Sequence, residues 1–387
     1  MNAVELSPLV LGPDAPLRRA SPRPEHLRNA AYTGQFDWET LAYDVYRVGH
    51  DIVIQGPPLF NLAAPLLAAP ALRSRFGPLF PRARRIERNR ASEIWLRSPA
   101  ERLVLDGPLG QFDVAVQPNQ SDRFAGRRVL HTLSKDNEPR WIIDWIRYYQ
   151  RVHGADAVLF YDNASTRYSA AALEAELTAA CPQLPITVVH WPYKYGPQGG
   201  LAGAVNGIET AWDSDYCQTG SLQHARFRFL RGAKSVLNVD IDELVVGREP
   251  VFAATEAARG GFLKFAGQWI TSATPNGITR ETCRHGHFTL RDREETESCP
   301  PKWCVVPAAC DDVRHTWSVH NLFGAPANRQ VTSEFAYRHL KGISNNWKYN
   351  RWDAGSFDAQ RYVEDEALRD ALALAGLLVP VAASAAA

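Results

Sequence analysis

The alternation of strand-like and helix-like segments after residue 128 constrains the fold of this chain more than any other feature. Its order is a strand at 128–133, a helix that Pro139 opens and Gly154 ends, a strand at 157–161, a helix at 170–180, a strand at 186–190, a helix at 222–231 and an apolar strand from 235. Apolar residues recur at helical spacing in the first helix, and the strands are nearly continuous apolar runs. This order predicts an α/β fold with a mostly parallel sheet flanked by helices.

The residues before this region have a different pattern. Residues 1–30 are rich in Pro and Arg, which predicts a flexible segment. Short alternating runs separated by Gly, Pro and Asn follow, so residues 31–125 are expected to form a small β-rich domain. The α/β domain is placed at 126–355. Residues 356–387 are expected to form a C-terminal helix, from about 358 to 375, and a tail.

A buried apolar strand that ends in two acids is the strongest functional signal. The run Ser235-Val-Leu-Asn-Val-Asp-Ile-Asp-Glu-Leu244 carries carboxylates at Asp240 and Asp242. Because side chains alternate along a strand, both carboxylates would project to one side if the strand stays extended. Such oxygen ligands suit Mg²⁺ or Mn²⁺, which keep positions open for phosphate oxygens. The alternative, a turn cap beside a solvated surface charge, is the commoner explanation of an isolated Asp-x-Asp.

Composition narrows the classes of partner. Lys plus Arg number 43 against 42 for Asp plus Glu, so no basic field for nucleic acid is expected. No apolar stretch is long enough to cross a bilayer, and the start lacks the pattern of a signal peptide. Six cysteines form no Cys-x-x-Cys, which predicts free thiols in a reducing compartment. We expect a cytoplasmic protein with no transmembrane segment, a state compatible with peripheral membrane contact.

Several sequence blocks, in order along the chain, resemble known glycosyltransferases. They are Lys135-Asp-Asn-Glu138 through Trp145-Ile-Arg-Tyr-Tyr149, Tyr161-Asp-Asn-Ala-Ser165, Gln223-His-Ala-Arg226, Asn238-Val-Asp-Ile-Asp-Glu-Leu244 and His339-Leu-Lys-Gly-Ile-Ser-Asn-Asn-Trp-Lys-Tyr-Asn-Arg351. From Arg128 to Arg351 the chain resembles family 92-like and related family 2-like glycosyltransferases. The resemblance implies a GT-A fold and sugar transfer from a nucleotide-sugar donor, a UDP-sugar being favoured. It also implies a glycan or glycolipid acceptor, as in polysaccharide biosynthesis.

The resemblance and the residues themselves assign the same roles around the donor. Asp240 and Asp242 would hold Mn²⁺ or Mg²⁺ across the diphosphate. His320, at the end of an apolar strand, would complete the metal site, and His339 is a weaker candidate. The nucleotide-binding candidates lie in polar loops or in a basic segment: Lys135, Glu138, Asp162, Asn163, Gln223, Lys341, Lys348 and Arg351. Their structural alternatives are an Asx turn at Asp162, a buried hydrogen-bonded imidazole at His320 and plain surface charges for the cations.

The catalytic base is less defined than the donor site. Inversion at the anomeric carbon, which the resemblance favours, needs a carboxylate that takes the acceptor proton. An acidic run follows the donor-binding half of the chain and contains Asp292, Glu294, Glu295 and Glu297. Glu295 is the candidate base. The alternative is that this run is a solvated loop.

Two other classes of function compete with sugar transfer. Phosphatases of the haloacid-dehalogenase type also place Asp-x-Asp after an apolar strand. However, their strand lies near the start of the catalytic domain, and they carry Thr or Val two residues beyond the second Asp, where this chain has Leu244. A non-catalytic carbohydrate-binding protein would use the β-rich domain as its binding module.

Overall fold

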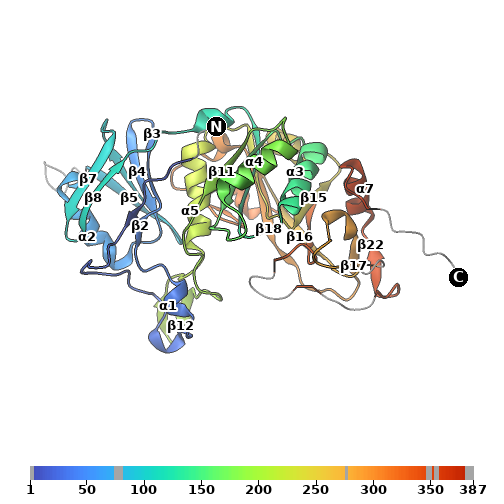
Figure 1. Cartoon of the computed structure of the whole chain (residues 1–387), viewed down its shortest axis with the longest axis horizontal. Helices are drawn as coiled ribbons and strands as arrows, with labels where there is room; N and C mark the ends of the chain where they lie inside the picture. The colour runs from blue at the N-terminus through green and yellow to red at the C-terminus, as the bar shows by residue number, and fades with distance from the viewer. Residues whose placement is uncertain (1–3, 74–81, 275–277, 346–350, 353–356, 380–387) are drawn as a thin grey trace. The chain divides into compact units, whose positions relative to one another are not determined.

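The computed structural model describes residues 4–73, 82–274, 278–345, 351–352 and 357–379 (Figure 1). Contacts divide the chain into two units: unit 1 consists of residues 1–123, 191–231 and 316–319, and unit 2 of residues 124–190, 232–315 and 320–387. The first change of unit lies close to the boundary predicted at residue 125. Residues 191–231, which the sequence placed in the α/β domain, are grouped with unit 1.

Unit 2 is built around an eight-stranded sheet with the order β11-β10-β9-β14-β18-β16-β21-β15. Its strands are β9 (Arg128–Ser134), β10 (Ala157–Asp162), β11 (Ile186–His190), β14 (Ser235–Asn238), β15 (Glu243–Gly247), β16 (Phe262–Ile270), β18 (Cys299–Val305) and β21 (Thr332–Leu340). The expected α/β fold is confirmed. The sheet is mixed, however, because β18 is antiparallel to both neighbours and β15 is antiparallel to β21. The parallel half contains the two helical crossovers, α3 (Pro139–His153) and α4 (Ala170–Ala180), and a parallel connection needs such a crossover.

The strands from β14 to β15 curl. Only residues 239–242, called the acidic turn below, connect these two strands, although they are four positions apart in the sheet order. Four strand spacings in a flat sheet measure about 19 Å, and five fully extended residue steps span at most about 18 Å. Because the acidic turn is not extended, the strands must wrap around it. An ion pair between Lys302 of β18 and Glu243 of β15 is a direct result of this curvature.

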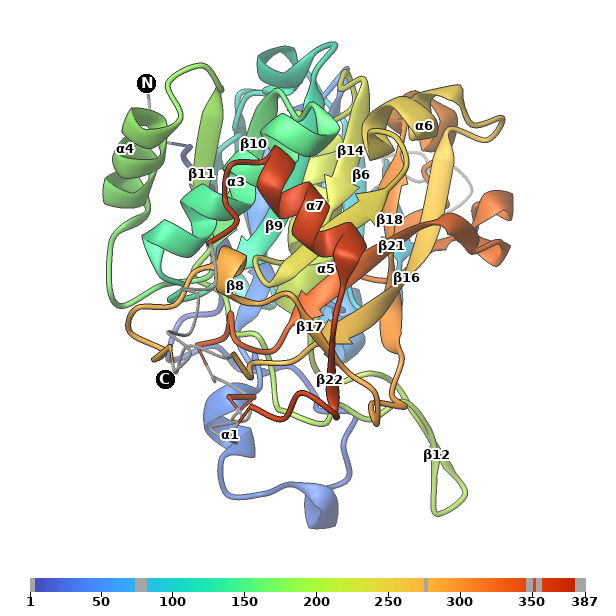
Figure 2. The same cartoon turned by 90° about the vertical axis from the view of Figure 1, so that its right-hand side faces the viewer.

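Helices of unit 2 share one hydrophobic core with the sheet. This core includes buried residues of α3, α4, α6 (Val251–Ala257) and α7 (Glu366–Leu374), and α7 contacts α3 over the sheet (Figure 2). On α3, the hydroxyls of Tyr148 and Tyr149 donate to the carbonyls of Val245 (2.6 Å) and Glu243 (2.9 Å). The helix therefore supports β15, the strand that follows the acidic turn. None of the described helices is long and apolar enough to cross a membrane.

The C-terminal helix is shorter than predicted. Residues 362–364 form β22 (Tyr362–Glu364), which pairs with β17 (Leu290–Asp292), so helix α7 begins only at Glu366. Asp365 caps this helix, because its carboxylate accepts the backbone N–H of Leu368 (2.9 Å). A helical spacing of apolar residues does not reveal that the first residues of a segment pair with a distant strand.

Unit 1 contains an antiparallel sheet with the order β3-β4-β6-β5 and a separate hairpin, β7–β8. The elements of this region are β1 (Leu9–Val10), α1 (Tyr32–Gln35), β2 (Thr40–Ala42), β3 (Asp44–Val48), β4 (Asp51–Gly56), α2 (Ala63–Leu67), β5 (Ala83–Glu87), β6 (Ser92–Arg97), β7 (Arg102–Gly107) and β8 (Gly110–Ala115). One hydrophobic core packs these strands together. The β-rich pattern of residues 31–125 therefore corresponds to antiparallel strands.

A buried ion network ties residues 191–231 to this β region. Helix α5 (Tyr216–His224) continues into a π-helical turn at 225–229, where the sequence predicted a helix at 222–231. His224 Nε2 (2.9 Å) and Arg228 Nη1 (2.6 Å) both contact Asp44 Oδ2 of β3, and all three side chains are fully buried. The partner of His224 and Arg228 is more than a hundred residues away, which local patterns cannot indicate.

Candidate functional site

The carboxyl ends of four parallel strands meet at one edge of the unit 2 sheet. Asp162 at the end of β10 pairs with Ser134 of β9 and with His190 of β11. Asn238, the last residue of β14, pairs with His131 of β9, so the acidic turn begins at the same edge. Ligands bind at this edge in open α/β sheets.

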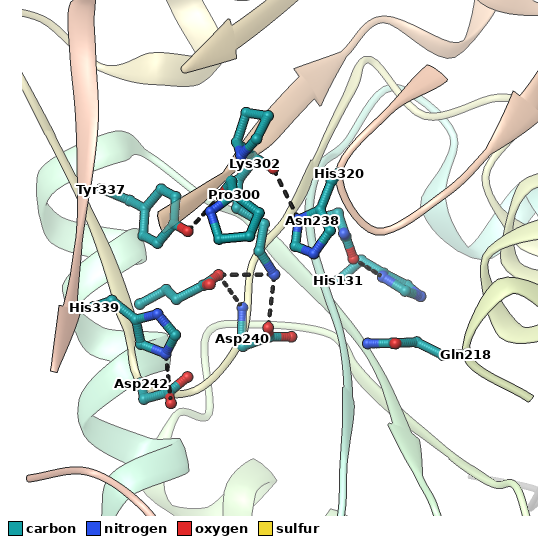
Figure 3. A network of polar contacts seen from close by, with 12 residues as sticks. His131, Gln218, Asn238, Asp240, Asp242, Pro300, Lys302, His320, Tyr337 and His339 are labelled. Atoms are coloured by element: carbon teal, nitrogen blue, oxygen red, sulfur yellow. Dashed lines mark hydrogen bonds and ion pairs between the residues drawn. The ribbon is translucent and has the colours of Figure 1, made fainter. Parts of the chain in front are cut away.

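The acidic turn corrects one expectation from the sequence. Strand β14 ends at Asn238, and residues 241–242 form a turn, so Asp240 and Asp242 are not on one extended strand. The backbone N–H of Asp240 donates to Glu243 Oε2 (2.8 Å), and the backbone N–H of Glu243 donates to Asp240 O (3.1 Å). Figure 3 shows the result: Asp240 contacts Lys302, and Asp242 contacts His339. The two carboxylates thus have different cationic partners.

Lys302 of β18 is the partner of Asp240. Its Nζ donates to Asp240 Oδ2 (2.6 Å) and lies 3.0 Å from Glu243 Oε2. The lysine side chain is fully buried, whereas that of Asp240 is 37% exposed. Burial opposes the charge on Lys302, but Asp240 and Glu243 outweigh it and raise the pKa of the lysine. Burial raises the pKa of Glu243 to about 7, and the charge of Lys302 opposes this shift.

Asp242 is held by two cations. His339 Nε2 of β21 donates to Asp242 Oδ2 (2.9 Å), and Arg351 Nη1 contacts the same oxygen (3.0 Å). Burial alone would raise the pKa of Asp242, but His339 and Arg351 lower it to about 2. Burial alone would likewise lower the pKa of His339, but Asp242 raises it to about 10. Asp242 is therefore ionised and His339 protonated at neutral pH.

The indole of Trp269 lies between His339 and Lys341, and Lys341 contacts the predicted base, Glu295. Trp269 of β16 stacks on His339 with ring centroids 4.2 Å apart, and Lys341 Nζ lies 5.3 Å from its centroid. Lys341 in turn donates to Glu295 Oε2 (2.5 Å), and this hydrogen bond lowers the pKa of Glu295. Two sequence candidates, Lys341 and Arg351, thus lie around one aromatic ring, since the Arg351 guanidinium is 5.4 Å from its centroid, and Glu295 is linked to the ring through Lys341.

Asp162 and Asn163 close β10 at the same edge. The carboxylate of Asp162 is buried, burial raises its pKa, and its Oδ2 accepts the N–H of Ser165 (3.4 Å). Asp162 Oδ1 has no hydrogen-bond partner among the described residues. The Asx turn capping the next helix, which the sequence left as an alternative, is not what the structure shows: the bond reaches the residue three positions on, and Ser169 caps α4. One buried carboxylate oxygen of Asp162 is left without a donor among the described residues. The backbone N–H of Asn163 donates to Ser134 O (2.8 Å).

The remaining candidates differ in their placement. Lys135 is exposed, and its carbonyl accepts the amide of Asn345. Glu138 precedes α3, and its carboxylate forms ion pairs with Arg140 and Arg167. Gln223 lies in α5 of unit 1 and donates to Trp317 O, so its polar contact there is structural. Lys348 lies outside the described residues.

The side chains expected to bind a divalent metal do not form a ligand set among the described residues. Two carboxylates and an imidazole suit Mn²⁺, but no group of three or more His, Cys, Asp or Glu in the described chain is placed to hold a metal. His320 Nδ1 contacts Pro301 O (3.0 Å). Asp240 and Asp242 are bound to Lys302, His339 and Arg351. A metal would have to displace these cations, so its binding stays a prediction.

Three residues of this network were not found from the sequence: Lys302, Trp269 and His131. His131 Nδ1 is 2.9 Å from Asn238 Oδ1, and burial lowers the pKa of this histidine to about 4, so it is neutral. A signal was present for two of them. Lys302 and His131 are polar residues within apolar strands, and buried polar groups of this kind need partners.

Comparisons with known proteins give little further information. Searches against protein-family models and against curated proteins found no match. Among solved structures, the chain is similar to WbbM, a bifunctional glycosyltransferase solved without ligand, at 11% identity and a TM-score of 0.27. The match covers 41% of this chain and 27% of the WbbM chain. These values are too low to assign a fold or an activity, so the assignment depends on the residues of this chain.

Proposed function

We propose that unit 2 transfers a sugar from a nucleotide-sugar donor to a hydroxyl acceptor. The observation that carries the proposal is the network at the carboxyl edge of the sheet. There, Asp240 and Asp242 lie beside Lys302, His339 and Arg351, and Trp269 connects these groups to the Lys341–Glu295 pair. A site for a nucleoside diphosphate needs cations for the phosphates and acceptor oxygens for the nucleoside, and both kinds of group are present.

Asp162 is the proposed contact to the nucleoside. Its buried Oδ1 lacks a hydrogen-bond partner among the described residues, and a buried carboxylate oxygen without a donor is costly. A uracil N–H or a ribose hydroxyl would supply that donor. This is why a uridine nucleotide is favoured over a ligand with no such groups.

Lys341 and Arg351 are the proposed contacts to the diphosphate. Both are partly exposed, and in the described structure each is paired with a carboxylate, Glu295 or Asp242. The diphosphate of a donor would compete for these cations. Positive charge fixed near the departing phosphate stabilises the transition state, because negative charge develops there as the bond to the sugar breaks.

Glu295 is the proposed base for an inverting reaction. When the donor takes Lys341, the carboxylate of Glu295 loses its cation and becomes a stronger base. The acceptor oxygen forms a bond to the anomeric carbon, its proton passes to Glu295, and the bond to the diphosphate breaks with both electrons leaving on oxygen. The products are the glycoside and a nucleoside diphosphate.

Substrate class and setting follow from the sequence resemblance. The acceptor would be a glycan or glycolipid in polysaccharide biosynthesis, and the reaction would take place in the cytoplasm. Mn²⁺ or Mg²⁺ bound by Asp240, Asp242 and His320 is a separate proposal, since the cations on the two aspartates would first have to leave. Titration with Mn²⁺ and with EDTA during nucleotide binding tests it independently.

Nucleotide binding is the first test. Isothermal titration with UDP, UDP-sugars and GDP should give saturable binding to the wild-type protein, and it should be weakened at least tenfold in Asp162→Asn. Asp113→Asn is the matched control, because Asp113 forms an exposed ion pair with Arg102 in unit 1. Failure of every uridine and guanosine nucleotide to bind would contradict the proposal. Release of phosphate from simple monoesters would favour the phosphatase instead.

The role of Glu295 has its own test. Glu295→Gln should lower the rate of sugar transfer by about 10²–10⁴-fold, because general-base catalysis contributes about that much. It should not weaken UDP binding, because the diphosphate no longer competes with this carboxylate for Lys341. Glu297→Gln, in the same acidic run and exposed, is the control. Equal rates in the two variants would exclude Glu295 as the base.

A further inference from the structure

Lys302 stands where strand β14 ends. In the antiparallel pairing of β14 with β18, Val236, Leu237 and Asn238 oppose Val305, Cys304 and Trp303. Lys302 is the next residue of β18, so it lies beside the start of the acidic turn. Its side chain has no exposed surface, although an ammonium is costly to bury without partners. Its position therefore requires the two carboxylates that it contacts.

Lys302 and Glu243 together hold Asp240 at two points. Glu243 Oε2 accepts the backbone N–H of Asp240 (2.8 Å) and also contacts Lys302 Nζ (3.0 Å). Lys302 Nζ donates to the carboxylate of Asp240 (2.6 Å). The backbone and the side chain of Asp240 are thus both restrained by one buried pair, and Figure 3 shows the contact between Lys302 and Asp240.

The exposure of the three side chains gives them different roles. Lys302 and Glu243 are buried, whereas Asp240 is 37% exposed. The lysine therefore approaches Asp240 from the interior and leaves part of that carboxylate open to solvent. A lysine that served only to neutralise the buried Glu243 would not need to contact Asp240 at 2.6 Å.

We infer that Lys302 is a positioning residue for donor binding: with Glu243 it fixes the orientation in which Asp240 meets the nucleotide-sugar. The inference rests on the proposed function, because Asp240 belongs to the network proposed there as the donor site. The proposed role of Lys302 is indirect, since its Nζ is occupied by Asp240 and Glu243. Its effect is transmitted through the conformation of the acidic turn.

The test separates positioning from simple charge compensation. Lys302→Met alone leaves Glu243 buried and unpaired, so this variant can lose stability for that reason only. The double variant Lys302→Met with Glu243→Gln removes both buried charges, and the amide oxygen of the introduced glutamine can still accept the N–H of Asp240. Glu243→Gln alone, which keeps Lys302 on Asp240, is the matched control. Thermal unfolding of each variant establishes that it is folded.

Two measurements decide the outcome. Hydrogen–deuterium exchange of a peptide covering residues 236–246 should be at least tenfold faster in the double variant than in the Glu243→Gln control. UDP affinity, measured by titration calorimetry, should be at least tenfold weaker in the double variant than in Glu243→Gln. Equal exchange in the two variants, or equal UDP affinity, would overturn the inference. If wild type binds no UDP, the proposed function fails, and the exchange measurement still decides whether Lys302 orders the turn.

Discussion

Asp44 in unit 1 and Asp242 in unit 2 are each held by a histidine and an arginine, but their surroundings differ. Asp44 is fully buried with His224 and Arg228, and its second oxygen accepts the backbone N–H groups of Ser7 (2.7 Å) and Val45 (2.9 Å). Asp242 is 17% exposed, and its side-chain bonds to described residues all involve Oδ2. The first carboxylate is saturated, whereas the second can exchange partners.

The two histidines are shifted in opposite directions. Burial lowers the pKa of His224, and the contact with Asp44 does not reverse this shift. Burial also opposes the charge of His339, but Asp242 raises the pKa of that histidine to about 10. The same three residue types therefore form a buried stabilising network in unit 1 and a charged, partly exposed site in unit 2. Burial, more than residue type, separates the two cases.

The largest expected effect is loss of stability at the saturated site. Asp44→Ala leaves the guanidinium of Arg228 in the interior without its carboxylate, and the free energy of unfolding should fall by about 3–5 kcal/mol. Urea unfolding followed by tryptophan fluorescence measures this loss. A decrease below about 1 kcal/mol would show that the network of unit 1 contributes little to stability. The proposed difference between the two carboxylates would then be wrong.

A substitution at the partly exposed Asp242 should affect activity more than stability. Asp242→Asn should reduce the rate of donor turnover by roughly 10²-fold, because His339 and Arg351 lose the carboxylate that holds their positive charge beside the departing phosphate. Its free energy of unfolding should fall by less than in Asp44→Ala, since Asp242, His339 and Arg351 keep 11–20% of their side-chain surface exposed, whereas the network of Asp44 is fully buried. Strong unfolding with intact turnover would reverse the assignment of the two regions.

A third histidine extends the comparison to pH. His153 is buried, its Nε2 donates to Val245 O (2.7 Å), and its Nδ1 accepts the N–H of Val251 (3.1 Å). Burial lowers its pKa to about 4, below the unfolded value of about 6.5. The unfolded state therefore binds a proton first as pH falls, and stability is lost between about pH 6.5 and 4, by about 1 kcal/mol already at pH 5.5. His153→Gln should flatten this part of the stability profile, and an unchanged slope would contradict the shift.

The smallest effect is expected at a fully solvated pair. Arg102 and Asp113 face each other across the β7–β8 hairpin at 2.8 Å, and both side chains are more than half exposed. Asp113→Asn should change the free energy of unfolding by less than about 0.5 kcal/mol, because water screens the charges. A loss comparable to that of Asp44→Ala would show that burial is not what distinguishes these carboxylates.

Much of the fold of unit 2 could be predicted from local pattern. The helix opened by Pro139 ends in the structure with Gly154 in the left-handed conformation (φ 72°), as its position after an amphipathic segment indicated. The strands at 128–133, 157–161 and 186–190 are parallel neighbours, as predicted, because helical crossovers connect them. These features depend on residues close together in the chain.

The acidic turn could not be predicted in this way. Val239 and Ile241 favour an extended strand by their β-branched side chains. Distant partners override that preference: Ile241 O contacts His285 Nε2 (2.8 Å), and Asp242 O accepts the N–H of Leu340 (2.8 Å). These distant groups give the carbonyls of Ile241 and Asp242 their partners at the bend.

The sequence by itself determined the parallel strands and the crossover helices at the start of unit 2, and it placed two acids just after a buried strand. Only the tertiary structure decided that Asp240 pairs with Lys302 and Asp242 with His339 and Arg351. Periodicity of apolar residues acts within one element and is therefore local. The partners of a carboxylate depend on which strands become neighbours and on how strongly the sheet curls, and both result from the packing of the whole unit.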